Sequence, residues 1–416
     1  MAAPCSSAGE IEEAIGMAKS MQELYDERMD RYWKANHLQK PDKVPFRPCA
    51  AELAGKIAGY TAQQVTHDPD LGLDAVVKMC QAVPGIDATV VNMVFVNTSV
   101  TESYGLKYYK VPGIDLDADD SFQYIEPQTE EDAFMKVEEY DRFIEDPNEF
   151  VMNVWLPRTS KYMVPPGEQN TWKNNLAWLK NGIAIQQYFQ KLGANVARMQ
   201  TETGTVSSLA GALKAPFDIL ADKFRGFRGI AYDLHRCPDK VLKATEAVAP
   251  HMAWNCIATA DPSRKVPCSH WMHRGATGFF SEEVFEKFHW PTLKMVTEQI
   301  WEAGIQTIYY AEGKWARNLK HFRQLPEQSI IFHCDKDDIY EVKRVLGDRF
   351  AISGGVPNDM LAFGEPADVK KRVKQLITDF GPDGGYLLDA EAIMQQDVKV
   401  ENFIAMAQAC EEYGYI

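Results

Sequence analysis

The sequence predicts an α/β protein, a (β/α)8 TIM barrel with an N-terminal helical extension. Short apolar runs alternate with helix-length periodic segments, a pattern typical of parallel strands covered by helices. In the last third of the chain strands recur roughly every 20–35 residues, which suits a barrel. No G-x-G-x-x-G or G-x-x-x-x-G-K-[ST] motif follows a strand, so the nucleotide-binding signals of the competing open, doubly wound sheet are missing. We therefore favour the barrel.

The elements follow from apolar periodicity along the chain. Residues 10–37 show apolar positions at helical spacing and predict a charge-rich helix that caps the barrel or contacts another subunit. The Pro-containing segment 40–46 connects this helix to the main domain. Strands are predicted at 87–96, 150–156, 306–312, 329–335, 350–355 and 384–390. Helices are predicted at 169–191, 205–224, 238–255, 281–303, 336–346 and 366–379, with Ser281 and the acids of 335–338 suited to helix starts.

Composition excludes several classes of function. The formal charge of −15 over 416 residues repels phosphate backbones and anionic lipid head groups. Eight irregularly spaced cysteines form no C-x-x-C pair, which indicates reduced cytosolic thiols. Early acids at Glu10, Glu12 and Glu13 do not fit a signal peptide, and no run of about 18 apolar residues occurs. We expect a cytoplasmic protein that binds neither nucleic acid nor membrane.

Several predicted strands end in polar residues, and in a barrel the chemistry gathers at the carboxyl ends of the strands. These residues are Glu312, His333, Asp335, Asp389 and Glu391. Because side chains alternate across a strand, His333 and Asp335 should share one face, and Cys334 should point away from them. Such a His-x-Asp pair can hold a metal, polarise a substrate or pass a proton. In the competing interpretation, Asp335 caps the next helix and His333 is a buried imidazole with satisfied hydrogen bonds.

The segment before the helix at 281, "HWMHRGATGFFS", adds His270, His273 and Arg274, and its glycines favour a loop. Arg274 can clamp a carboxylate or phosphate with two hydrogen bonds, or it can form a surface ion pair. The piece "DLHRCP" at 233–238 is similar to a D-x-H-x-x-G corrinoid motif, but Pro238 replaces the glycine, so we interpret it as structural.

The C-terminal third resembles the uroporphyrinogen decarboxylase superfamily. The similar stretches are "GFFSEEVFEKFHWPTLKMVTEQIWEAGI", "HCDKDDIYEVKRVLGDRFAISGGVPNDMLAFGEPADVKKRVKQLI" and "GGYLLDAEAIMQQDVKVENFIAMAQACEEYG". "KPDKVPF" and "AGYTAQQVTHDP" resemble the opening of that superfamily. The resemblance implies a (β/α)8 barrel with its site at the mouth. We accordingly expect an extension at 1–40 and a barrel at 41–416 with an insertion near 104–170.

Two branches of the superfamily are relevant. The decarboxylases bind substrate carboxylates with an arginine-rich "RQAGRY"-type motif, whereas the corresponding region here reads "RPCAAELAGKIAGYT". Corrinoid-linked methyltransferases that act on thiols bind zinc with an H-x-C pair and a later cysteine. Here His333 matches the histidine, while Asp335 and Ala392 occupy the two cysteine positions. Both zinc thiolates are therefore lost, and zinc should bind more weakly than in such a site or not at all.

From this resemblance we expect a methyltransferase that moves a methyl group between a small substrate and a corrinoid (cobalamin) on a partner protein. The alternatives are a decarboxylase of a polycarboxylate and a non-catalytic binder of a corrinoid or tetrapyrrole; a homodimer fits each of them. The leaving atom of a methyl donor needs an acid or a metal nearby. The catalytic candidates are His333, Asp335, Glu312 and His273, and the first three could also form an oxygen-and-nitrogen metal site. The substrate-binding candidates are Arg274, Trp271, Phe279, Tyr310, Trp315 and Arg317. We expect His333→Ala to remove activity without unfolding the protein.

Overall fold

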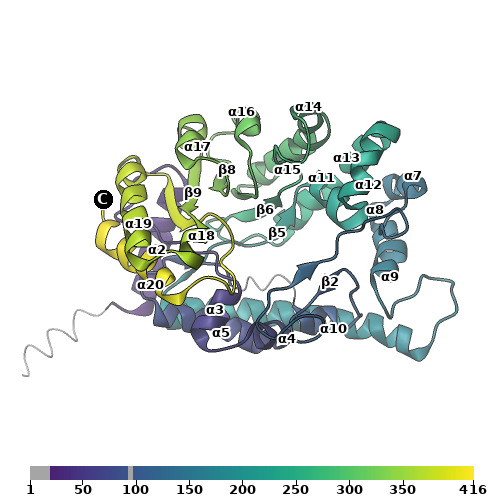
Figure 1. The fold of residues 1–416 in the computed structure, drawn as a ribbon, viewed down its shortest axis with the longest axis horizontal. Coiled ribbons are helices and arrows are strands. Elements are labelled where there is room, and N and C mark those ends of the chain that lie inside the picture. Colours follow the sequence, from purple (N-terminus) through teal and green to yellow (C-terminus); the bar gives the residue numbers. More distant parts are fainter. Residues whose placement is uncertain (1–18, 92–96) are drawn as a thin grey trace, which may run out of the picture.

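The computed structural model describes residues 19–91 and 97–416, and Figure 1 shows a sheet of strands with helices on both sides. The strands are β1 (Ala88–Thr89), β2 (Tyr109–Lys110), β3 (Gln123–Tyr124), β4 (Val206–Ser207), β5 (Ala212–Lys214), β6 (Cys268–Met272), β7 (Thr307–Ala311), β8 (Ile330–Cys334), β9 (Ala351–Val356) and β10 (Tyr386–Ala390). In the first half of the chain the helices are α2 (Met21–Asn36), α3 (Glu52–Ala58), α4 (Ala62–His67), α5 (Pro69–Ala82), α6 (Thr98–Thr101), α7 (Tyr140–Glu145), α8 (Pro147–Phe150), α9 (Leu156–Thr159) and α10 (Trp172–Arg198). Further along they are α11 (Pro216–Ile219), α12 (Gly226–Arg236), α13 (Pro238–Ala258), α14 (Glu282–Val284), α15 (Trp290–Glu302), α16 (Leu319–Phe322), α17 (Ile339–Leu346), α18 (Asn358–Phe363), α19 (Pro366–Phe380) and α20 (Val400–Tyr413).

Parallel pairing arranges the strands as in a (β/α)8 barrel. Six strands pair in the order β10-β9-β8-β7-β6-β5, and each of these pairs is parallel. Phe46 bridges Leu388 of β10 and accepts a backbone hydrogen bond from Asp87, just before β1. β1 pairs with β4, and the chain then runs directly into β5. The predicted fold class is therefore confirmed.

Helix α2 covers the amino ends of the strands. Its Tyr32 is fully buried and donates a hydrogen bond of 2.6 Å to the carbonyl of Ser208. Gln306, just before β7, donates a hydrogen bond of 2.8 Å to the carbonyl of Asn36 at the end of the helix. Of the helix predicted at 10–37, residues 10–18 lie outside the described residues, and the remainder acts as a cap of the barrel.

Alternation along the strands separates an inner core from an outer core. Inside the barrel, Ile308, Ile331 and Leu387 pack with α2 residues. On the outer faces, side chains such as Phe332 pack against the surrounding helices. Figure 1 shows α15, α16 and α17 on one side of the strands and α3, α5 and α10 on the other. Among the described residues, no helix is long and apolar enough to cross a membrane.

Most of the later predicted elements are confirmed and two earlier ones are not. The predicted strands at 306–312, 329–335, 350–355 and 384–390 appear as β7 to β10. Of the strand at 87–96, β1 is present and 92–96 lies outside the described residues. The predicted strand at 150–156 is wrong, because this apolar run continues a helix that Asp146 caps and Pro147 starts. The predicted helix at 205–224 is wrong in its first half, which forms β4 and β5.

Strand β6 replaces part of the loop that the sequence predicted before residue 281. Its polar residues Ser269 and His270 hid the apolar pattern of a strand, although all five residues are buried. The antiparallel β2–β3 hairpin lies within the segment 104–170 that the sequence predicted to be an insertion. The division of the chain at residue 40 stays a prediction.

Candidate functional site at the barrel mouth

A cavity of about 390 Å³ lies at the carboxyl ends of the strands. Its wall combines aromatic rings with cationic and anionic side chains. The lining residues are Tyr109, Phe122, Tyr124, Lys214, Asp222, Lys223, Trp271, His273, Arg274, Glu312, Asp335, Ala392, Ile393 and Gln395. Lys214 ends β5, His273 follows β6, Glu312 follows β7 and Asp335 follows β8. Parallel strands thus bring residues from distant parts of the chain to one mouth.

The hairpin β2–β3 contributes a second wall to this cavity. Tyr109 and Tyr124 face each other in register across the two strands, and their ring centroids lie 5.6 Å apart. Together with Phe122 they supply aromatic surface opposite Trp271. The site therefore depends on the segment 104–170 as well as on the barrel.

Asp222 organises the cations of the mouth. Its carboxylate accepts hydrogen bonds from His273 Nε2 at 3.0 Å and Arg274 Nε at 2.6 Å, and it pairs with Lys214 Nζ at 2.8 Å. Burial alone would raise the pKa of Asp222, but His273 and the two cations hold it far below its ordinary value. Arg274 also donates a hydrogen bond of 2.8 Å to Glu126. Two of the three cavity cations are therefore neutralised by the chain's own carboxylates.

Lys223 is different, because no carboxylate within the described residues lies at ion-pair distance from its ammonium group. Its Nζ donates a hydrogen bond of 2.8 Å to the hydroxyl of Tyr109. The same atom lies 4.7, 4.8 and 4.5 Å from the ring centroids of Tyr108, Tyr109 and Tyr124. Burial, reinforced by the charge of Lys214, lowers the pKa of Lys223 to about 7. This lysine can therefore exchange a proton near neutral pH.

Two acids complete the wall. Burial raises the pKa of Glu312, whose Oε2 lies 3.8 Å from His273 Nδ1. Asp335 accepts a hydrogen bond of 2.8 Å from the backbone of Gly313 through Oδ2. Within the described part of the chain, its other oxygen and His273 Nδ1 make no hydrogen bond although both are buried. The competing interpretation, in which Asp335 caps the next helix, is wrong, because the side chain of Asp338 caps α17.

His333 lies below the cavity and does not line it. Trp271 lines the cavity and stacks on Tyr310 at 3.9 Å between centroids, and the Tyr310 ring contacts His333 at 4.8 Å. His333 Nδ1 accepts a hydrogen bond of 3.1 Å from Arg47, so its Nε2 donates the bond of 3.0 Å to the carbonyl of Glu391. Burial, together with the charge of Arg47, lowers the pKa of His333 to about 3. The imidazole is therefore neutral.

The predicted face assignment on β8 is confirmed, because His333 lies inside the barrel and Cys334 packs in the outer core. A zinc site built on His333, Asp335 and Glu312 does not fit. Both ring nitrogens of His333 are engaged in hydrogen bonds, and the methyl group of Ala392 offers no ligand. Among the described residues, only one group of three possible ligands converges, and it lies on other elements.

Four of the predicted substrate-binding residues lie outside the wall of this cavity, which differs from the prediction. Trp315 is fully buried in the outer core, where its ring contacts Phe322. Arg317 is exposed and donates a hydrogen bond to the carbonyl of Thr277. Phe279 is 41% exposed and lies against Arg274 rather than in the cavity wall. Tyr310 is also absent from the wall, since Trp271 covers it.

Sequence reasoning missed Lys214, Asp222 and Lys223, together with the three cavity aromatics of the hairpin. The first three fell within the helix predicted at 205–224. The stretch "LKAPFD" could have shown where the helix starts, because a proline is favoured at the first position of a helix and the residue before a proline is extended. Here Pro216 starts α11 and Ala215 is extended. A strand ending at Lys214 follows from that pattern.

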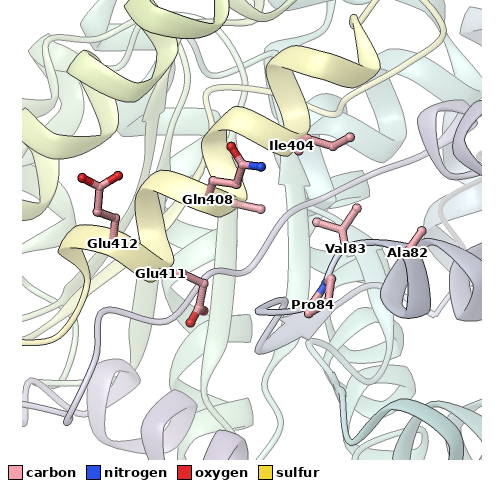
Figure 2. A pocket seen from close by; sticks show the side chains of 8 residues that line it. Ala82, Val83, Pro84, Ile404, Gln408, Glu411 and Glu412 are labelled. Atoms are coloured by element: carbon pink, nitrogen blue, oxygen red, sulfur yellow. The ribbon is translucent and has the colours of Figure 1, made fainter. Parts of the chain in front are cut away.

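Other hollows lie along the described part of the chain. One of about 320 Å³ adjoins the mouth and shares Tyr109 and Lys223 with it. Another, of about 460 Å³, lies between the end of α5 and α20 (Figure 2). Figure 2 shows Val83 and Pro84 facing Ile404 and Gln408 there, and Glu411 of this groove pairs with Lys43. The lining of this groove contains Glu411 and Glu412 and no cationic side chain, unlike the lining of the barrel mouth.

Comparisons with known proteins agree with the observed fold. A family model described as uroporphyrinogen decarboxylase (URO-D) matches residues 176–413. A solved structure of a methyltransferase from Methanosarcina mazei is similar with a TM-score of 0.60 and 14% sequence identity. That similarity covers 93% of this chain and 98% of the other, and at this identity it concerns the fold. The comparison with curated protein sequences gave no match.

Proposed function

The chain belongs to the uroporphyrinogen decarboxylase family, and on that premise we propose that it is an enzyme that moves a methyl group between a small substrate and a corrinoid on a separate protein. The similarity of fold to a methyltransferase supports this choice of branch. The corrinoid supplies the centre that exchanges the methyl group. The chain supplies the binding cavity and the proton.

The observation that carries the proposal is the charge balance of the mouth. A decarboxylase of a polycarboxylate needs several unpaired cations that converge on its substrate. Here Lys214 and Arg274 are paired with Asp222. Glu312 and Asp335 add two further carboxyl groups to the same wall, and Lys336 pairs with Asp335 at 3.5 Å. This cavity therefore offers a polyanion only Lys223 as a cation that is not paired with a carboxylate among the described residues, whereas it can accept a small neutral methylated molecule.

The segment that corresponds to the arginine motif of the decarboxylases supports the same choice. Its first residue, Arg47, is fully buried and donates a hydrogen bond of 2.9 Å to Asp389. It donates a second bond of 2.6 Å to Tyr310. This arginine is thus bound to the chain's own residues beneath the cavity and is not available to a substrate.

Lys223 is the group best placed to assist the transfer. When a methyl group leaves an oxygen, sulfur or nitrogen atom, the bonding electron pair stays on that atom, and a proton there lowers the barrier. The ammonium of Lys223 lies in the cavity wall with a pKa of about 7, so it can give up this proton near neutral pH. Water then restores the ammonium form. His273, Glu312 and Asp335 stay candidates for orienting the substrate.

An assay with a supplied corrinoid tests the proposal. The chain is incubated with cob(I)alamin and a panel of O-, S- and N-methylated compounds, and cob(I)alamin consumption is followed by visible absorption. Consumption that depends on both chain and methyl donor is the expected result. Release of CO2 from a porphyrinogen without cob(I)alamin consumption would favour the decarboxylase. Tight corrinoid or tetrapyrrole retention on gel filtration, with neither reaction, would favour the non-catalytic binder.

A further inference from the structure

Three potential metal ligands converge on helices outside the barrel, and none of them lines the cavity at the mouth. Glu282 lies on α14, Glu286 lies on the helical turn Phe285–His289, and His321 lies on α16. One ligand atom from each lies within 4.8 Å of the other two. We propose that these residues bind a divalent transition-metal ion, for which zinc is the natural probe.

The distances fit ligands of one metal better than a hydrogen bond. His321 Nε2 lies 3.5 Å from Glu282 Oε1 and 3.4 Å from Glu286 Oε1. Within the described residues, this nitrogen makes no hydrogen bond. Nitrogen and oxygen ligands at about 2.0–2.1 Å from a tetrahedral zinc stand roughly 3.3–3.4 Å apart. Both distances from the histidine nitrogen to a carboxylate oxygen therefore already match such an ion, and the two carboxylates lie within 4.8 Å of each other.

Burial fixes the imidazole, whereas the side chains of the two glutamates are partly exposed. His321 is only 6% exposed, and its ring packs against Phe285 at 5.4 Å between centroids and Trp290 at 6.1 Å. A buried ring nitrogen without a hydrogen bond is costly, and a metal ion would satisfy it. The side chains of Glu282 and Glu286 are 30% and 51% exposed. An ion can thus enter from solvent, and water can complete its coordination.

The donor set selects the kind of ion. One imidazole nitrogen and two carboxylates suit zinc or a similar transition metal. Calcium and magnesium prefer sites made of oxygen ligands alone. The ammonium of Lys320 contacts the same Glu282 oxygen and would compete with the ion. Removal of Lys320 should therefore strengthen binding, whereas removal of a ligand should weaken it.

A bound ion would join two of the helices that follow neighbouring strands. Glu282 follows the loop from β6 that carries His273 and Arg274, and His321 follows the loop from β7 that carries Glu312. Linking α14 to α16 restrains the outer ends of both loops. This site does not depend on the proposed methyl transfer, so either proposal can fail alone.

Metal titration of the full-length chain tests the proposal. Protein stripped with EDTA is titrated with ZnCl2 by calorimetry, and with CoCl2 by visible absorption, which distinguishes nitrogen and oxygen ligands from thiolates. We expect one site per chain and an increase in melting temperature with added zinc. Loss of a supporting residue around a metal costs 10–100-fold in affinity, so His321→Gln and Glu286→Gln should each weaken binding by at least about 100-fold. Lys320→Gln should bind zinc more tightly than the wild type.

Two matched controls locate the site. Glu283→Gln removes the same charge from the same helix turn outside the cluster, and Asp335→Asn changes the mouth; both should retain wild-type affinity. Absence of zinc-induced stabilisation would overturn the proposal. A thiolate signature in the cobalt spectrum, or equal affinity of His321→Gln and wild type, would overturn it as well.

Discussion

Arg47 Nη2 donates a hydrogen bond of 2.9 Å to the carboxylate of Asp389, and both side chains are fully buried inside the barrel. Arg47 also contacts Tyr310, His333 and Ser353. Asp389 accepts further hydrogen bonds from the backbone of Cys49 at 3.1 Å and Ala390 at 2.8 Å. One ion pair thus connects the start of the barrel chain to its last strand, directly beneath the mouth.

Arg47→Met should destabilise the protein by about 3–5 kcal/mol, because it leaves the Asp389 carboxylate buried without its charge partner. The double variant Arg47→Met/Asp389→Leu should recover part of this loss, since it removes both buried charges. Urea unfolding of the wild type, both single variants and the double variant measures the effect. A double variant that is less stable than either single variant would contradict the interpretation.

His333→Ala should lower stability by roughly 1–3 kcal/mol, because it leaves the carbonyl of Glu391 without the donor that the imidazole provides. The sequence led to the opposite expectation, an inactive but fully stable variant. Thermal unfolding and turnover per folded molecule should be measured together. If the variant unfolds at the wild-type temperature but has no turnover, His333 is catalytic, as the sequence predicted.

Lys223→Met should lower the rate of methyl transfer by about 10²–10⁴-fold if this lysine gives its proton to the leaving atom. The wild-type rate should fall as pH rises through about 7, because the ammonium form is lost there. This fall of the rate with rising pH should be absent in Lys223→Met, and also in Lys223→Arg, because the arginine side chain stays charged. Rates from pH 5.5 to 9 on the same substrate provide the measurement.

The control for Lys223 is Lys110→Met, which removes an exposed lysine from the same hairpin that holds Tyr109. It should retain both rate and pH profile. An unaltered pH profile in Lys223→Met would show that another group supplies the proton.

Asp222→Asn should cost about 1.5–3 kcal/mol at neutral pH, because charged hydrogen bonds to His273 and Arg274 become neutral ones. The pKa of Asp222 is held far below its unfolded value of about 3.8. The stabilisation that the Asp222 carboxylate gives to the folded protein is therefore fully present above pH 4 and is lost as the pH falls further. The unfolding free energies of the wild type and the variant should converge as the pH is lowered from 7 through 4 to 2.5. A constant difference down to pH 2.5 would contradict the assignment.

The local sequence pattern was sufficient to assign the strands in the second half of the barrel. In the first half it led to wrong assignments. Strands β7 to β10 are short, almost wholly apolar runs between amphipathic helices, so period and length identify them. The run at 150–156 is equally apolar but lies in a helix, because short apolar segments do not distinguish the two structures. Strand β6 was hidden by polar residues that the surrounding helices bury.

The sequence by itself determined the fold class, the family resemblance and the face on which each residue of β8 lies, since alternation along a strand is a local property. It also placed Glu312 and Asp335 at strand ends and His273 in the loop before the helix at 281. Only the tertiary structure decided which of these reach the cavity. Lys214, Asp222 and Lys223 meet them there because parallel strands converge in space, and the β2–β3 hairpin adds aromatic rings from a distant segment. His333 lies below the mouth, where it accepts a hydrogen bond from Arg47, which is 286 residues away in the chain. Such pairings depend on contacts across the barrel, which no local sequence pattern records.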